Sequence, residues 1–105
     1  MNPLPVLIVE DDQDLLEAIC ATMRLSGYQA IAASNGDDAM AILQERQVGI
    51  VISDVQMKPT DGLLLLKNIK AIHPELPVLL MTAYREIDKA VTAMRMGACD
   101  YLLKP

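Results

Sequence analysis

The sequence predicts an α/β fold in which a parallel sheet is covered by helices on both faces. Five short apolar segments alternate along the chain with longer segments in which apolar residues recur at helical spacing. The short segments are apolar throughout, as is typical of buried strands, and strands joined by helical crossovers form a doubly wound parallel sheet. The 105 residues have room for one domain with a modest core.

The expected elements follow one another in a regular order. The strands comprise residues 6–9, 29–33, 50–52, 78–81 and 101–103. Helical stripes fill the intervals between them, and the clearest consists of Ile87, Ala90, Val91 and Met94. We expect these four apolar side chains to face the core.

Capping residues mark the ends of the expected helices. Gly27 and Gly97 stand where left-handed C-caps would end the first and fourth helices. Ser34 or Asn35 can cap the start of the second helix, and Asp61 the start of the third. The capping pattern therefore agrees with the periodicity.

Charged and polar residues follow four of the five strands. The acidic run 10–12 follows the first strand, and Asp54, Thr82 and Lys104 follow the third, fourth and fifth. Right-handed crossovers bring the carboxyl ends of parallel strands to one edge of the sheet, where ligands bind in such folds. We expect these residues to form one site.

A cluster of carboxylates at this edge requires a cation. At ~5 Å and an effective dielectric of ~20, each like-charged pair costs about 3 kcal/mol. Lys104 can offset one charge, and Mg²⁺, which prefers oxygen ligands, can offset two. Asp54, held rigidly by a buried strand and expected to be exposed, can then act as a nucleophile toward phosphorus, assisted by the Thr82 hydroxyl.

Four segments together resemble the receiver domain of bacterial two-component response regulators: LIVEDD, VISDVQM with TDG after it, VLLMTAY, and AMRMGACDYLLKP. The resemblance covers the whole chain, so residues 1–105 are expected to be one receiver domain. It implies a flavodoxin-like sheet with strand order 2-1-3-4-5. The last two segments are most similar to receivers of sigma-54-dependent transcriptional activators, in which an ATPase domain and a DNA-binding domain follow.

The resemblance implies roles for individual residues. Asp54 matches the phosphoacceptor for a sensor histidine kinase, Thr82 the hydroxyl that closes onto the phosphoryl group, and Lys104 the lysine that pairs with it. Tyr101 matches the aromatic switch residue, whose ring turns inward when Thr82 moves. Phosphorylation is thus expected to control a transcriptional output through conformational and oligomeric change.

The resemblance also implies metal ligands and tuning positions. Asp11, Asp12, Asp54 and the backbone carbonyl of Gln56 match the ligands of Mg²⁺. Gln56 and Tyr84 match positions that tune the loss of the phosphoryl group. We therefore expect a phosphoacceptor domain that catalyses only its own phosphorylation and dephosphorylation, and otherwise is not an enzyme.

Three features depart from the family pattern. Lys58 stands where the family usually has proline, near enough to the pocket to influence it, and Arg85 stands where close relatives often have glycine. The chain stops at Lys104-Pro105, where receivers normally continue into a fifth helix. Without that helix one face near the last strands would be bare, which predicts self-association, domain exchange or reduced stability.

Composition limits the partners and the compartment. A net charge of −5 disfavours direct binding of nucleic acid or anionic lipid. The start of the chain lacks the pattern of a signal peptide or membrane span, so a cytoplasmic protein is expected. Cys20 and Cys99 are expected to be two buried thiols rather than a disulfide. The partners implied are a histidine kinase, the output domains of a parent protein, and a second copy of the chain.

Other functions fit the sequence less well. Asp12-Gln13-Asp14 gives the Asp-x-Asp of a haloacid-dehalogenase phosphatase, but the residue two positions later is not the expected Thr or Val. A flavoprotein would need a first loop that cradles phosphate, which the acidic run 10–12 would repel. A receiver-shaped interaction module that is not phosphorylated remains the main alternative.

Overall fold

The computed structural model describes residues 3–57 and 61–104, within which the chain forms one five-stranded parallel sheet, four α-helices and a 3₁₀ helix. The strands are β1 (Val6–Val9), β2 (Ala30–Ala33), β3 (Ile50–Asp54), β4 (Val78–Thr82) and β5 (Asp100–Leu103). The helices are α1 (Gln13–Leu25), α2 (Gly36–Glu45), α3 (Gly62–Ile72), η1 (Tyr84–Glu86) and α4 (Ile87–Arg95). The strand order β2-β1-β3-β4-β5 confirms the predicted fold class and sheet order.

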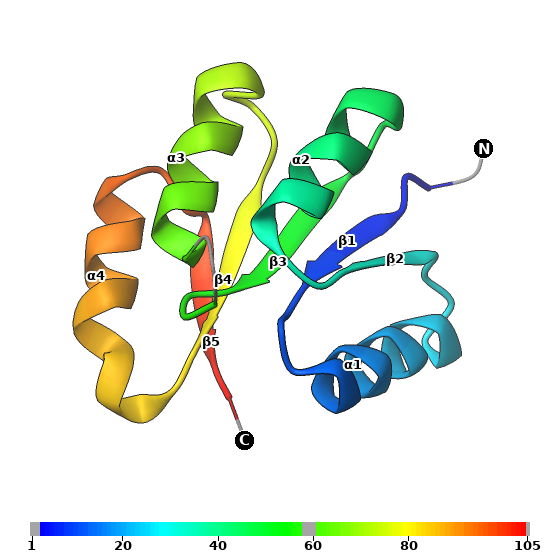
Figure 1. Cartoon of the computed structure of the whole chain (residues 1–105), viewed down its shortest axis with the longest axis horizontal. Coiled ribbons are helices and arrows are strands. Elements are labelled where there is room, and N and C mark those ends of the chain that lie inside the picture. Colours follow the sequence, from blue (N-terminus) through cyan, green and yellow to red (C-terminus); the bar gives the residue numbers. More distant parts are fainter. Residues whose placement is uncertain (1–2, 58–60, 105) are drawn as a thin grey trace.

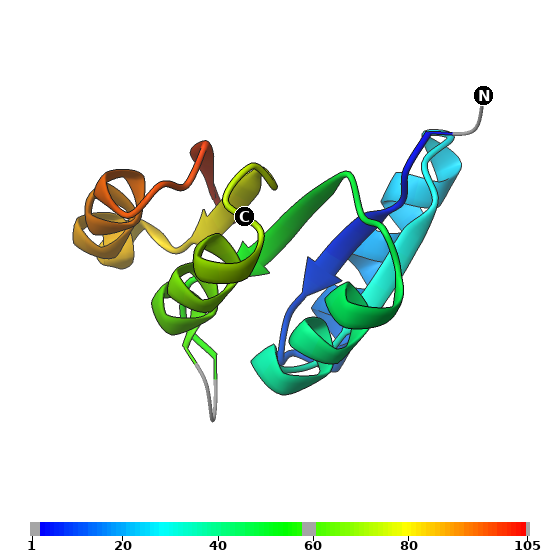
Figure 2. The same ribbon diagram turned by 90° about the horizontal axis from the view of Figure 1, so that it is seen from above.

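The helices divide between the two faces of the sheet, as Figures 1 and 2 show. Helix α1 packs on one face through a small core that includes Leu16, Cys20, Val6 and Ile8. Helices α2, α3 and α4 cover the other face and share a larger core with the sheet. Alternate residues of β1 face the two cores: Val6 and Ile8 face the smaller core, and Leu7 and Val9 face the larger one. This explains why β1 is apolar throughout.

The predicted caps are present. Asn35 and Asp61 accept hydrogen bonds from backbone amides in the first turns of α2 and α3. Gly27 and Gly97 have φ angles of +94° and +106°, a left-handed conformation that glycine adopts without steric cost. The ends of these helices thus follow from local sequence.

Two strands extend further at their carboxyl ends than predicted, and β5 begins one residue earlier, at Asp100. The pairing of Asp54 with Met81 and of Thr82 with Leu103 continues the ladder, so β3 and β4 end with Asp54 and Thr82. These two residues are therefore the last of their strands and not the first of the following loops. Their backbones are held by neighbouring strands, which fixes the direction of their side chains.

The apolar stripe predicted for α4 was partly wrong. Ala90 and Ala93 are buried, whereas Val91 and Met94 are exposed. The small side chains face the sheet, which rotates the buried stripe away from Val91 and toward Ala93. On β5, Leu102 and Leu103 are also exposed.

The prediction of two buried thiols was correct for Cys20 and wrong for Cys99. Both cysteines are free, but only Cys20 is buried. Cys99 lies between α4 and β5, where its backbone amide bonds to Val78 while its side chain faces solvent. Among the described residues, no helix is long and apolar enough to cross a membrane.

Candidate functional site

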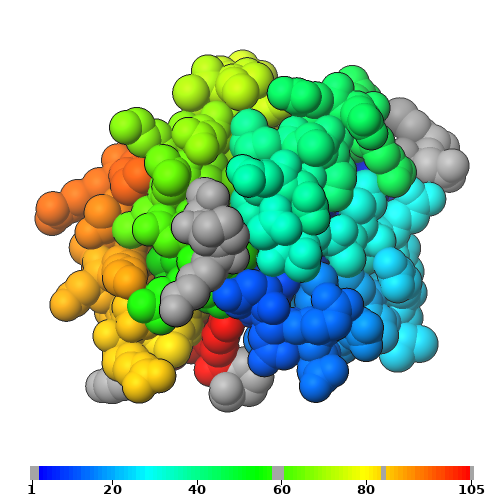
Figure 3. Space-filling model, viewed as in Figure 1, coloured from blue at the N-terminus to red at the C-terminus, as the bar shows by residue number. Residues whose placement is uncertain are grey.

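The carboxyl ends of the strands bring together segments that are far apart in sequence. Figure 3 shows the segment after β1, the segment after β4 and the end of β5 gathered on one rim of the molecule. The backbone amide of Lys104 donates to the carbonyl of Thr82 at 2.8 Å, and that of Val55 donates to Met81 at 2.9 Å. Backbone hydrogen bonds therefore continue one residue past β3 and β5, and they fix the backbone positions from which the candidate site side chains project.

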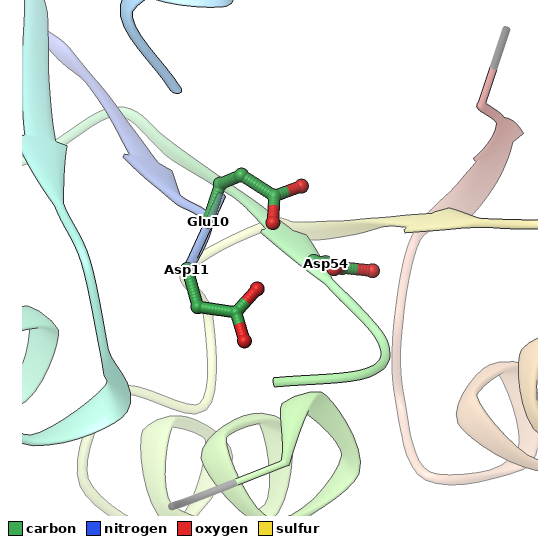
Figure 4. Close-up of side chains that lie close together, drawn as sticks. All are labelled: Glu10, Asp11 and Asp54. Atoms are coloured by element: carbon green, nitrogen blue, oxygen red, sulfur yellow. The ribbon is translucent and has the colours of Figure 1, made fainter. Parts of the chain in front are cut away.

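Three carboxylates converge at this rim. Oxygen atoms of Glu10, Asp11 and Asp54 all lie within 4.8 Å of one another. Figure 4 shows that Glu10 and Asp11, adjacent after β1, point their carboxylates into the space beside Asp54 at the end of β3. Glu10 is fully buried and Asp54 is 3% exposed, whereas Asp11 is exposed. The expectation of an exposed Asp54 was therefore wrong, because the β3 ladder continues to this residue.

Lys104 binds the two buried carboxylates. Its ammonium lies 2.8 Å from Glu10 Oε1 and 2.8 Å from Asp54 Oδ2. The other oxygen of Asp54, Oδ1, accepts a hydrogen bond from the backbone amide of Gln56 at 3.2 Å. Both oxygens of Asp54 are thus held in place, which is the positioning that a nucleophilic carboxylate requires.

The ionisation of the site reflects its burial. Burial raises the pKa of Glu10 above its ordinary value of 4.5, although hydrogen bonds from Lys104 and from the Asp12 amide oppose the rise. Burial also disfavours the charged form of Lys104, but hydrogen bonds to Asp54 and Glu10 outweigh it and raise the lysine pKa above 10.5. Lys104 is therefore a permanent cation, opposed by more than one carboxylate.

Asp12 lies outside the cluster. Its side chain accepts a hydrogen bond from the Leu15 amide at 3.2 Å and caps α1, while its backbone amide donates to Glu10 Oε2 at 3.1 Å. The second carboxylate that the acidic run contributes is that of Glu10, which the sequence placed at this edge but which was not predicted as a metal ligand. The signal was available, since Glu10 directly follows a buried strand and Asp12 immediately precedes a helix.

Gly62 allows the start of α3 to lie close to the end of β3, at Asp54 and Val55. Its amide donates to the carbonyl of Val55 at 2.9 Å. A Cβ atom at this position would lie 2.7 Å from the Cα of Val55 and closer still to the carbonyl oxygen of Asp54. No side chain fits there, so glycine is required for this packing.

Comparison with known proteins identifies the family. Residues 6–105 match the response regulator receiver domain family. The chain is a response regulator receiver domain. The receiver is 49% identical over 100 residues to the response regulator protein FleR of Pseudomonas aeruginosa, a match covering 95% of this chain and 21% of FleR.

Other relatives are transcriptional regulators. The receiver is 40% identical over 102 residues to the transcriptional regulatory protein ZraR of Salmonella typhimurium, covering 97% of this chain and 23% of ZraR. It is 39% identical over 100 residues to the DNA-binding transcriptional regulator NtrC of the same species, covering 95% of this chain and 21% of NtrC. The chain thus spans between 21% and 23% of the length of these relatives.

Solved structures show the same fold. The receiver domain of NtrX from Brucella abortus superposes with a TM-score of 0.92 at 34% identity, covering 95% of this chain and 85% of that one. A response regulator receiver domain protein from Clostridium thermocellum gives a TM-score of 0.93 at 30% identity, covering 98% of this chain and 83% of that one. The predicted fold and family are therefore confirmed.

The remaining predicted residues lie around the receiver site. Thr82 is buried, and its hydroxyl donates to the carbonyl of Ala83 at 3.2 Å. Tyr101 is partly buried and packs against the larger core, while the Gln56 side chain is exposed. The side chain of Tyr84 and all of Lys58 lie outside the described residues, so their predicted tuning roles stay predictions.

The chemistry of the site fits Mg²⁺. Its three converging carboxylates supply the oxygen donors that this ion prefers, and the exposure of Asp11 leaves room for the water ligands that it retains. Glu10 Oε1 is buried and lies 2.8 Å from the Lys104 ammonium, and no further partner for this oxygen is present in the described part of the chain. A buried oxygen with remaining acceptor capacity is what a cation at this position would use.

Proposed function

We propose that this receiver domain accepts a phosphoryl group on Asp54 from a sensor histidine kinase and thereby controls a transcriptional output. One observation carries the proposal: Asp54 ends a buried strand with one oxygen held by Lys104 at 2.8 Å, within 4.8 Å of two further carboxylates. Phosphoryl transfer depends mainly on positioning and on neutralising charge, and this arrangement supports both.

Different residues would act as nucleophile, as charge-stabilising group and as metal ligands in phosphoryl transfer. An oxygen of Asp54 attacks phosphorus in line with the bond to the donor, and Lys104 stabilises the charge on the phosphoryl oxygens. Glu10, Asp11, Asp54 and the backbone carbonyl of Gln56 would hold Mg²⁺. This set replaces the predicted ligand Asp12 with Glu10 because Asp12 caps α1. When bound, the ion neutralises charge on the carboxylates and on the phosphoryl group.

Thr82 and Tyr101 are proposed to convert phosphorylation into a conformational change. The Thr82 hydroxyl bonds only weakly within its own segment, to Ala83 at 3.2 Å, so it can exchange this bond for one to a phosphoryl oxygen. Tyr101 is partly buried on the adjacent strand β5, paired with Leu80. A movement of the Thr82 side chain would therefore be passed to Tyr101 and to the exposed surface of β5, because β4 and β5 are paired.

The cellular role follows from the relatives. The chain spans between 21% and 23% of three relatives that are named as regulators. We therefore propose that it acts in the cytoplasm as the input domain of a larger sigma-54-dependent activator. The ATPase and DNA-binding domains would carry the output, without direct contact between the receiver and nucleic acid. In this role its only catalysis would be of its own phosphorylation and dephosphorylation.

Intact-mass spectrometry tests the proposal. The purified chain is incubated with acetyl phosphate and Mg²⁺, beside an Asp54→Asn variant and a sample with chelator. We expect the mass of one added phosphoryl group in the parent chain and none in either control. If a folded, Mg²⁺-binding parent chain gains no mass, the function is instead that of an interaction module that is not phosphorylated.

A further inference from the structure

A hollow of about 550 Å³ adjoins the carboxylate cluster. It is lined by Asp11, Gln56, Met57, Asp61 and Lys89. Asp11 belongs both to this lining and to the cluster around Asp54, so the hollow is continuous with the proposed site of transfer. The leaving group of a phosphodonor must occupy a space beside Asp54 during transfer, and this hollow provides one.

Lys89 is the basic residue among the side chains that line this hollow in the described part of the chain. Lys104 is already bound to Glu10 and Asp54. The Lys89 ammonium lies 3.3 Å from Glu86 Oε2, and its side chain is 42% exposed. The Glu86 side chain is 18% exposed and lies at the N-cap of α4, so this ion pair is only partly solvated. The more exposed Lys89 side chain can turn from Glu86 to another anion at modest cost.

The two acidic lining residues do not compete strongly for this lysine. Asp61 accepts a hydrogen bond from the Leu64 amide at 2.8 Å and caps the positive end of α3. Asp11 belongs to the carboxylate cluster, whose negative charge a bound cation would offset. Lys89 is thus the lining group suited to an incoming anion.

We propose that Lys89 binds the anionic leaving group of the phosphodonor in this hollow and so favours donors whose leaving group departs as an anion. The inference rests on the proposed phosphorylation of Asp54. With acetyl phosphate, a bond forms between an Asp54 oxygen and phosphorus while the bond between phosphorus and the acetyl oxygen breaks. Acetate leaves with that electron pair, no proton is transferred, and the negative charge that develops on acetate lies against the Lys89 ammonium.

Phosphoramidate provides the contrasting donor. Its bond between phosphorus and nitrogen breaks, the nitrogen already carries its proton in the zwitterion, and neutral ammonia leaves. Lys89 has no anion to stabilise in that case. One exposed charge pair changes a rate by about fivefold, and the effect falls as salt screens the charges.

The test measures initial rates of mass gain at saturating Mg²⁺ and low ionic strength. It compares the 105-residue chain with Lys89→Gln, Lys89→Arg and a control, Arg95→Gln, which removes an exposed charge from the last turn of α4 outside the hollow. We expect Lys89→Gln to slow phosphorylation by acetyl phosphate by about fivefold and by phosphoramidate by less than about twofold. Lys89→Arg and Arg95→Gln should stay near the parent rate, and added salt should reduce the difference.

Each other outcome decides against the inference. Equal slowing with both donors would show that Lys89 attracts phosphate anions in general, and no slowing would show that it does not contribute. In either case Asp54 remains the phosphoacceptor, because the parent chain gains mass. If the parent chain itself gains none, the proposed function fails, and the role of Lys89 fails with it.

Discussion

A single methyl group at Gly62 should destabilise the receiver, although helix propensity predicts the opposite. Gly62 is the first residue of α3 and does not have a positive φ, so alanine suits its backbone and would gain up to about 1 kcal/mol of helix propensity. The tertiary structure opposes this gain. The added Cβ would lie 2.7 Å from the Cα of Val55 and nearer still to the carbonyl oxygen of Asp54.

The size of the effect depends on what must move. The atoms that would clash belong to the backbone of Asp54 and Val55. This backbone is held against β4 by the hydrogen bond that the Val55 amide donates to the carbonyl of Met81. Overpacking in such a place costs about 1 to 3 kcal/mol, which exceeds the propensity gain. Because Asp54 carries one of the clashing atoms, its carboxylate should also shift, and we expect phosphorylation to slow by about tenfold or more.

Urea unfolding at saturating Mg²⁺, paired with intact-mass kinetics, measures both effects. Gly49→Ala serves as a control because its Cβ would first meet the Cβ of Leu4 at 3.2 Å, in an exposed residue that can move. Gly97→Ala isolates conformational strain, since that position has φ +106° and the nearest atoms to its added Cβ belong to the flexible side chain of Lys70, at 3.6 Å or more. A Gly62→Ala variant as stable and as reactive as the parent chain would refute the reasoning.

Further expected outcomes concern the charges and thiols. Asp12→Ala should lower the free energy of unfolding by about 1 kcal/mol through loss of the α1 cap, yet weaken Mg²⁺ binding in calorimetry less than Glu10→Gln does. In chelator, Lys104→Met should cost about 3 kcal/mol in urea unfolding because two buried carboxylates lose their ammonium, and Mg²⁺ should restore part of this. Because the folded-state pKa of Glu10 is raised, its favourable contribution is complete below pH 4.5 and is lost as the pH rises through the folded-state value. Without metal, the Glu10→Gln variant should therefore have a higher free energy of unfolding than the parent chain at neutral pH, but not below pH 4.5. The same difference in free energy of unfolding at both pH values would contradict this. Iodoacetamide should modify exposed Cys99 quickly and Cys20 only on unfolding, since burial raises the pKa of the Cys20 thiol; two equally fast additions by mass would contradict it.

The exposed apolar residues bear on a prediction that stays open. Val91 and Met94 on α4 and Leu102 and Leu103 on β5 are exposed. These side chains give α4 and β5 exposed apolar surface. Whether that surface leads to self-association or domain exchange is a prediction for measurement of mass in solution across a dilution series.

The sequence by itself determined the sheet, its helices and the strand ends at which the site lies. Apolar runs and helical stripes are local patterns, and the handedness of crossovers then requires that Asp54, Thr82 and Lys104 lie at one edge. The N-caps Asn35 and Asp61 and the glycines at positive φ were also predictable, because each depends on a few neighbouring residues.

Only the tertiary structure decided which members of the acidic run reach the site. The chain turns from β1 into α1 within residues 10–12, so the direction of each side chain depends on how the helix packs on the sheet. That packing directs Glu10 and Asp11 toward Asp54 and leaves Asp12 as the helix cap. The burial of Asp54, the steric need for Gly62 and the position of Lys89 beside the hollow arise in the same way, from contacts between segments that local sequence patterns do not encode.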